Sequence, residues 1–477
     1  MFFLSLEFYI FFLVSFLVYF ALPQRMRCFF LLGASYLFYM QWRVGYVFVL
    51  LFCTVITYST AILMDRFSGK REKKILLLIS IVSNFGLLCF YKYLNFANES
   101  LETLLSYFSL PYHIPHLEIL LPLGISFYTL QAVSYSLDVY RGDQRPERHF
   151  GAFSLYLAFF PKLISGPIER ASHLLPQLKR KADFDAERIF SGLKLLVWGI
   201  FKKVVIADRL GIYVSMVFNH PHDFSGQTLI LAAWFYTLQL YCDFSGYTDM
   251  AIGCGRVFGI ELSQNFNFPY FARNIADFWR RWHMTLTRWL RDYLYIPLGG
   301  NRCRPSRWRM NILTVFVLCG LWHGANWTFV LWGALHGFYY LFGRATIRIR
   351  MQCWKTIRAR GGLLTLWQVF VTFNLVTLAW ILFRSNSIQD ALYIFSHLFV
   401  DIATPVYLGP SQFGTIITVL LLISFILMES MLYLFNKGYF RAVSTIPFAM
   451  KCPLYSILLI SIFLFGVSSH EFIYFHF

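Results

Sequence analysis

The sequence predicts an all-α, polytopic integral membrane protein. Three observations support this class: 58% of the 477 residues are apolar, only 14% are charged, and the mean hydropathy is +0.56. Soluble globular proteins are about 45–50% apolar and about 25% charged. Long apolar runs recur along the whole chain, so a soluble enzyme, a disordered chain and a fibrous repeat are excluded.

The apolar segments give the expected membrane crossings, because a crossing needs about 20 largely apolar residues. They are residues 2–22, 28–42, 45–63, 75–94, 119–140, 150–168, 189–218, 228–258, 310–342, 364–384, 414–436 and 453–470. Several are too long or too broken for one straight helix, so we expect about 11–12 membrane segments with short or re-entrant helices among them. No linker or repeat interrupts them, which predicts a single membrane domain over residues 1–477.

The net charge of +18 gathers in particular loops. Residues 65–74 carry five Lys or Arg, residues 301–309 carry four Arg, and residues 343–360 carry six Lys or Arg. The loops without Lys or Arg are residues 95–118, 219–227 and 401–413. The positive-inside rule places the basic loops in the cytoplasm and the others outside, with both termini outside. The basic loops favour contact with anionic lipid, whereas apolar segments this long exclude nucleic acid as the partner.

Residues 310–342 form an apolar stretch of 33 residues with a basic loop at each end. Two full crossings need about 40 residues and a turn. We therefore expect a short or re-entrant hairpin that turns near Gly320 and Gly324. His323, at its midpoint, then lies deep in the membrane, where an ionisable side chain is costly and typically functional. A neutral imidazole there can act as a general base, and a hydrogen-bonded packing residue is the alternative.

A second histidine, His283, lies in a stretch of aromatic and basic residues at 278–293. Wound as one helix, this stretch places four arginines on one stripe and a Trp-rich surface opposite. That pattern is typical of a helix lying at the membrane surface, with His283 at the edge of the aromatic face. Arg280 and Arg281 then either bind anionic lipid or meet a phosphate-bearing donor at a cytoplasmic mouth.

Other polar residues near the apolar segments give weaker signals. Asp243 and Asp249 either line a polar cavity or pair with arginine, because an unpaired carboxylate there would be costly. His336, on the second arm of the hairpin, is expected to pack or to support another residue, and Lys162 is expected to be a structural or interfacial residue instead of a nucleophile. The Pro and Gly at residues 122–124 predict a break in the fifth segment.

Residues 265–277, the stretch 278–302 and the Trp-His-Gly motif at 322–324 together resemble the membrane-bound O-acyltransferase family. The resemblance covers most of the chain and is greatest to the bacterial branch that O-acetylates alginate or D-alanylates teichoic acid, the alginate type above all. It implies helices that form a central funnel or tunnel through the membrane. It also implies that His323 is the family's essential intramembrane histidine and that His283 is its second, cytoplasm-proximal histidine.

The chemistry implied is acyl transfer from a thioester. Acetyl-CoA or an acylated carrier protein is expected to arrive from the cytoplasm as co-substrate, and we expect no metal and no bound cofactor. His323 is expected to act as general base on an acceptor hydroxyl, while His283 positions the donor or assists proton transfer. Trp322 and Asn326 are candidates for hydrogen bonds near the oxyanion. The remaining candidate substrate-binding residues are Asp277, Arg280 and Arg281.

The acceptor implied by the resemblance is an exported cell-envelope polysaccharide such as alginate. Exported or membrane-anchored acetyltransferase partners finish the transfer in alginate-type systems, so we expect such a partner here, and a location in the bacterial inner membrane. D-alanyl or other acyl transfer to a cell-envelope polymer is the nearest alternative. A proton-coupled transporter is the rival class, since intramembrane histidines can relay protons. A non-catalytic scaffold would leave the two histidine motifs unexplained.

Overall fold

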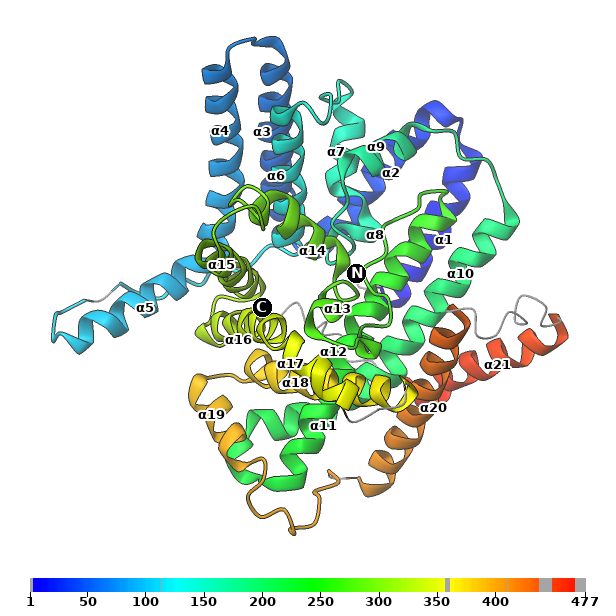
Figure 1. Ribbon diagram of the computed structural model, residues 1–477. Helices are drawn as coiled ribbons and strands as arrows, with labels where there is room; N and C mark the ends of the chain where they lie inside the picture. The colour runs from blue at the N-terminus through cyan, green and yellow to red at the C-terminus, as the bar shows by residue number, and fades with distance from the viewer. Residues whose placement is uncertain (1–2, 113, 357–360, 410, 437–447, 468–477) are drawn as a thin grey trace.

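The computed structural model describes residues 3–112, 114–356, 361–409, 411–436 and 448–467. Every regular element within these ranges is helical, which confirms the predicted all-α class. Helices surround a central group formed by α12 to α16, and α3, α4 and α6 stand together as a projecting bundle (Figure 1). The single domain over residues 1–477 stays a prediction.

Several described helices are long and apolar enough to cross a membrane by length and composition. They are α3 (Tyr46–Arg66), the continuous helix Lys70–Tyr107 that contains α4 (Lys70–Leu88) and α5 (Leu94–Tyr107), α18 (Gly361–Arg384), and α20 (Gln412–Asn436). Other apolar helices are shorter, such as α1 (Leu6–Ala21). The chain is therefore a multi-pass membrane protein with many short helices, as predicted. The last predicted segment, 453–470, lies partly outside the described residues.

The N-terminal half packs around α6 (Ile125–Arg141). This helix contacts α3, α4 and α7 (Phe150–Ala158), and α7 also contacts α2 (Gln24–Met40). Gly124 precedes α6 with a φ of 74°, and a Cβ there would lie 2.2 Å from a backbone oxygen of Leu163. Glycine is required at this turn, so the predicted break at residues 122–124 is confirmed.

A long pair of helices forms the centre. The 32-residue α12 (Gly226–Val257) packs along α10 (Ala186–Ile200), and a π-helical segment, η2 (Phe201–Ala207), joins α10 to α11 (Asp208–Asn219). Further helices along the chain are η1 (Cys89–Tyr93), α8 (Phe160–Leu163), α9 (Ala171–Lys179), η3 (Pro221–Asp223), η4 (Pro269–Phe271), α17 (Ile347–Thr356), α19 (Ile388–His397) and α21 (Phe448–Phe465).

Buried ion pairs join η2 to α12. The ammonium of Lys203 lies 2.8 Å from a carboxylate oxygen of Asp243 and 2.8 Å from one of Asp208, and Lys202 lies 2.5 Å from Asp249. The two aspartates singled out in the sequence are therefore paired, but with lysines instead of the predicted arginines. The π-helical turn explains the partners, because it turns two successive lysines toward α12.

The predicted hairpin at residues 310–342 is confirmed. It consists of α15 (Pro305–His323) and α16 (Trp327–Ala345), which pack against each other on either side of a turn at residues 324–326. At Gly320 a Cβ would lie 2.1 Å from a backbone oxygen of Phe329, so only glycine allows the two backbones to approach this closely. Helix α18 covers the outer side of α16.

The single surface helix predicted for residues 278–293 is wrong. The chain forms α13 (Ile275–Trp279), a turn, α14 (Met284–Leu290) and the π-helical η5 (Arg291–Tyr295). Tertiary contacts override the helical period: the carbonyl of Asn265 accepts from the Met284 N–H at 2.9 Å, and its side-chain oxygen accepts from the Thr285 hydroxyl at 2.6 Å. The aromatic side chains are buried in the core, so the segment is an interior element.

Candidate functional site

Three buried histidines form a row with two tryptophans, at the point where α14, α15 and α16 meet. Trp322 lies between His283 and His323, with ring centroids 6.1 Å and 4.9 Å away. Trp332 lies between His323 and His336, at 5.2 Å and 5.0 Å. His283 and His336 are fully buried and His323 is 3% exposed. The structure therefore brings together the two histidines that the sequence singled out.

The end of α15 places His323. Helix ends leave their last carbonyls without intrahelical partners. Here the side chains of η1 supply donors: the Lys92 ammonium donates to the carbonyls of Trp322 and His323 at 2.7 Å and 2.8 Å, and the Tyr93 hydroxyl donates to that of Leu321 at 2.8 Å. A π-helical turn on a distant segment thus fixes the histidine's backbone.

His283 occupies a strained backbone position. Its φ of 40° and ψ of 54° fall in the left-handed region, which few residues other than glycine adopt. The Asn265 bonds to Met284 and Thr285 hold this turn, and Thr285 in turn accepts from the Ile168 N–H at 3.1 Å. Both ring nitrogens of His283 lack a hydrogen-bond partner among the described residues. An imidazole held this firmly with free nitrogens is suited to bind or protonate a ligand.

His336 has the supporting role expected from the sequence. Its Nδ1 accepts a hydrogen bond from the indole N–H of Trp279 at 3.3 Å, and its ring stacks on Phe278. Lys162 is also structural as expected: it is fully buried and its ammonium donates to the side-chain oxygen of Gln131.

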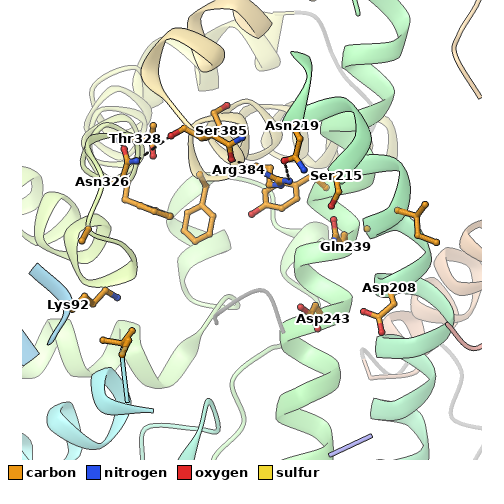
Figure 2. Close-up of a pocket in the computed structure, with 18 of the residues that line it drawn as sticks. Lys92, Asp208, Ser215, Asn219, Gln239, Asp243, Asn326, Thr328, Arg384 and Ser385 are labelled. Atoms are coloured by element: carbon orange, nitrogen blue, oxygen red, sulfur yellow. Dashed lines mark hydrogen bonds between the residues drawn. The ribbon is translucent and has the colours of Figure 1, made fainter. Parts of the chain in front are cut away.

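A cavity of about 960 Å³ opens beside the hairpin turn. Figure 2 shows its two walls, with Lys92 and Asn326 on one side and Asp243 and Gln239 on the other. Such a volume is at the upper end of the roughly 300–1,000 Å³ typical of small-molecule sites. The cavity therefore has room for a ligand larger than an acyl group.

Two phenylalanines separate this cavity from His323. Phe329 and Phe383 line the cavity, their rings pack edge to face at 4.8 Å, and the Phe383 ring lies 5.3 Å from that of His323. His323 thus lies directly behind this wall and is shielded from the water of the cavity.

The candidate residues near the turn have different surroundings. Trp322 is buried between the imidazoles, and its indole N–H has no hydrogen-bond partner in the described part of the chain. Asn326 caps α16: its side-chain oxygen accepts from the Thr328 N–H at 2.9 Å, and it lines the cavity. The oxyanion role stays a prediction for both residues.

Asp277, Arg280 and Arg281 form a local ion-pair group instead of a row along a surface helix. The Asp277 carboxylate lies 3.1 Å from Arg281 and 3.6 Å from Arg280, and Arg281 also lies over the ring of Tyr433. The Arg280 side chain is 71% exposed and the Arg281 side chain 18%. Only Arg280 is open to solvent, and the substrate-binding role stays a prediction for all three residues.

Sequence reasoning missed Lys92, Lys203 and Arg384 as cavity residues. Each lies within or at the end of a predicted membrane segment, and a cation there is itself a functional signal. Lys92 and Lys203 are on π-helical turns, which no sequence pattern revealed. No group of three or more His, Cys, Asp or Glu that could hold a metal is present in the described residues.

Comparisons with known proteins place the chain in a family. A family model for membrane-bound O-acyltransferases matches residues 148–385, which include both histidines and the hairpin. The protein named "Probable alginate O-acetylase" of Azotobacter vinelandii is 39% identical over 80% of this chain and 74% of its own length. A peptidoglycan O-acetyltransferase of Helicobacter pylori is 37% identical over 76% of this chain and 71% of its own length.

A more distant relative is the teichoic acid D-alanyltransferase of Bacillus subtilis, 30% identical over 47% of this chain and 59% of its own length. The expected resemblance is therefore confirmed by both the family match and the long alignments. The chain belongs to the membrane-bound O-acyltransferase family, and its activity is that of an O-acyltransferase.

Proposed function

We propose that this protein moves an acyl group, in the first place acetyl, from a cytoplasmic thioester toward an exported cell-envelope polysaccharide such as alginate. The names of the relatives support a cell-envelope polymer as the acceptor, because they refer to acetylation of alginate and peptidoglycan and to D-alanylation of teichoic acid. The donor is acetyl-CoA or an acylated carrier protein. The membrane is the bacterial inner membrane.

One observation supports this function most directly: His323 lies between a cavity on one side and His283 on the other. Asn95 and Asn219 line the cavity, and each begins a loop without Lys or Arg. The positive-inside rule places these two loops outside the cell. His283 lies at the start of α14, and the chain continues through η5 to the basic loop at residues 301–309, which the same rule places in the cytoplasm. An acyl group that passes from donor to acceptor would therefore meet His323 midway.

In the proposed reaction His323 acts as general base. A ring nitrogen takes the proton of the acceptor hydroxyl, the oxygen attacks the thioester carbonyl carbon, and the carbon–sulfur bond breaks as the ester forms. The proton then passes to the departing thiolate. General-base catalysis contributes about 10²- to 10⁴-fold to such rates. His283, with both ring nitrogens free in the described part of the chain, holds the donor carbonyl or assists this proton transfer.

The phenylalanine wall fits this chemistry. A thioester next to a base is open to hydrolysis unless water is excluded. Phe329 and Phe383 keep the cavity's water from His323, and a side-chain movement of Phe383 would admit the acceptor hydroxyl. A membrane-anchored or exported partner that completes transfer to the polymer is part of the proposal.

The test is the O-acetyl content of the exported polysaccharide, measured by NMR in a deletion strain complemented at matched membrane levels. Wild type should restore acetyl esters, and His323→Ala and His323→Gln should lower them at least about 10²-fold. His116→Ala is the matched control, because His116 is an exposed histidine whose side chain is 63% accessible. Normal acetylation by a folded His323→Ala protein would refute the general base.

The same strains distinguish the acyl group and the rival class. Unchanged acetyl esters in the deletion strain, together with a loss of D-alanyl esters, would assign D-alanyl transfer instead. A proton-coupled transporter would leave both kinds of ester intact in the deletion strain.

A further inference from the structure

The cavity beside the hairpin contains a charge imbalance. Of the cations that line it, Lys203 is paired with two carboxylates, those of Asp208 and Asp243. Arg384 and Lys92 make no ion pair with a carboxylate in the part of the chain that the structure describes. The group of Lys203 and its two carboxylates carries a net charge of −1, and Lys92 and Arg384 add two positive charges, so the charged side chains of the lining sum to a net charge of +1.

Arg384 ends α18 and is held by neutral partners. Its guanidinium donates to the side-chain oxygens of Asn219 at 2.9 Å and Asn386 at 3.4 Å, and it lies 5.6 Å from the ring centre of Phe218. Figure 2 shows Arg384 at one end of the cavity and Lys92 across from it. Amide oxygens orient a guanidinium but do not cancel its charge, and a charge that is partly removed from water is costly without a counter-ion.

The Lys92 ammonium is hydrogen-bonded to the backbone at the end of α15. Its two carbonyl partners belong to the negative end of a helix, which compensates part of its charge. Arg384 also lies at the negative end of a helix, as the last residue of α18, but its guanidinium donates only to side-chain amides, those of Asn219 at the end of α11 and of Asn386. Of the two cations without a carboxylate partner in the described residues, Arg384 is thus the one that is not bonded to the backbone of α15.

The rest of the lining is suited to a sugar. Side-chain amides and hydroxyls of Asn219, Gln239, Asn326 and Ser215 face the cavity, and Tyr91 and Tyr236 add aromatic surface. Amides and hydroxyls match the alternating donors and acceptors of saccharide hydroxyls. The cavity volume of about 960 Å³ exceeds what an acetyl group needs.

We propose that this cavity binds an acidic saccharide and that Arg384 holds its carboxylate or phosphate. Arg384 directly follows Phe383, the ring that contacts His323. An anion on Arg384 would therefore set a neighbouring hydroxyl against the wall that covers the base. This inference rests on the proposed function for the identity of the acceptor, and it adds the residue that binds the acceptor's anionic group.

The experiment measures binding to the purified full-length protein in nanodiscs. The probes are a uronic acid tetrasaccharide, the same tetrasaccharide with its carboxyl groups reduced to alcohols, and a glycerol phosphate oligomer of similar length. We expect the uronate to bind at least about 10-fold more tightly than its reduced form, since a charge-assisted hydrogen bond is worth about 1.5–3 kcal/mol. The glycerol phosphate oligomer distinguishes carboxylate from phosphate as the preferred anion.

The variants assign the effect to one residue. Arg384→Gln should lose the preference for the charged probe while still binding the reduced one, and Arg384→Lys should keep part of it. Arg43→Gln is the matched control, because Arg43 is an exposed arginine in the loop between α2 and α3, outside the cavity lining. Thermal unfolding of each variant in the same nanodiscs confirms that it is folded.

His323→Ala separates this inference from the proposed function, because it should bind the uronate as wild type does even though transfer is lost. Equal affinity for the charged and reduced probes, or wild-type preference in Arg384→Gln, would overturn the inference. So would failure of the wild-type protein to bind any of the three probes, which would favour a protein as the direct acceptor.

Discussion

Replacement of Lys92 tests whether its hydrogen bonds to the end of α15, which we call the clamp, position His323 for acyl transfer. Lys92→Met keeps the length of the side chain and removes the ammonium that donates to the carbonyls of Trp322 and His323 at 2.7 Å and 2.8 Å. A hydrogen bond to a charged group is worth about 1.5–3 kcal/mol, so the two together set an upper limit of about 3–6 kcal/mol. Lys92 lines the cavity, where water can replace part of these hydrogen bonds. We therefore expect Lys92→Met to lower the free energy of unfolding by about 2–3 kcal/mol.

The effect on activity should be larger than the effect on stability suggests. These two hydrogen bonds hold the backbone of the proposed base, and a misplacement of about 1 Å can cost about 10²-fold in rate. We therefore expect Lys92→Met to lower kcat for acyl transfer about 10²-fold while the KM of the donor changes little, because the donor is on the side of His283.

Thermal unfolding in detergent and transfer of labelled acetyl groups in membrane vesicles give the two readouts. Lys92→Arg should recover most of the rate, since it keeps the charge and the donors. Lys74→Met, an exposed lysine on α4, is the matched control. A folded Lys92→Met protein with wild-type kcat would refute the claim that this clamp positions His323.

Three further predictions concern packing, pH and buried charge. Gly320→Ala should force α15 away from Phe329 and lower both the unfolding temperature and activity, at a cost of about 1–3 kcal/mol from overpacking; a wild-type unfolding temperature would contradict this. The hydrogen bond to Glu169 raises the pKa of His173 above its usual value, so its stabilisation is complete below about pH 6.5 and is lost as pH rises through the raised value. The unfolding temperature of wild type relative to His173→Asn should therefore fall with rising pH, and a constant difference would be inconsistent with the linkage. Lys203→Met should destabilise the protein by about 3–5 kcal/mol, because it leaves two buried carboxylates uncompensated; denaturant titration would show this, and an unchanged midpoint would exclude it.

Sequence patterns were sufficient for the fold class and for the position of His323, the proposed base. Composition and apolar runs predicted the helical membrane protein, and the basic loops around residues 310–342 predicted the hairpin that places His323 at a turn. The glycines at 320 and 324 indicated the close packing there. These features depend on hydrophobicity, charge and backbone sterics, which are local properties of the sequence.

The surroundings of His283 could not be predicted in the same way. A helical period was present at residues 278–293, but the contacts of Asn265 with Met284 and Thr285 break the helix and turn His283 inward. These contacts join segments about 20 residues apart in sequence, and no pattern in one stretch reveals them.

The same limit applies to the cations. Lys92 meets the end of α15 from 230 residues away, and Arg384 meets Asn219 from 165 residues away. Their presence in apolar segments was visible in the sequence, but their shared cavity was visible only in the folded chain. The donor- and acceptor-side roles proposed for the row of histidines rest on that assembly.

The most direct test of the central claim uses inside-out membrane vesicles that contain the protein, its polymer and any partner. Labelled acetyl-CoA is supplied on the exposed cytoplasmic face, and acetyl esters on the enclosed polymer are counted after the vesicles are opened. Wild-type vesicles should accumulate labelled esters, and vesicles with His323→Ala at the same protein level should not. Equal labelling in both would contradict the claim that His323 carries acyl transfer across this membrane.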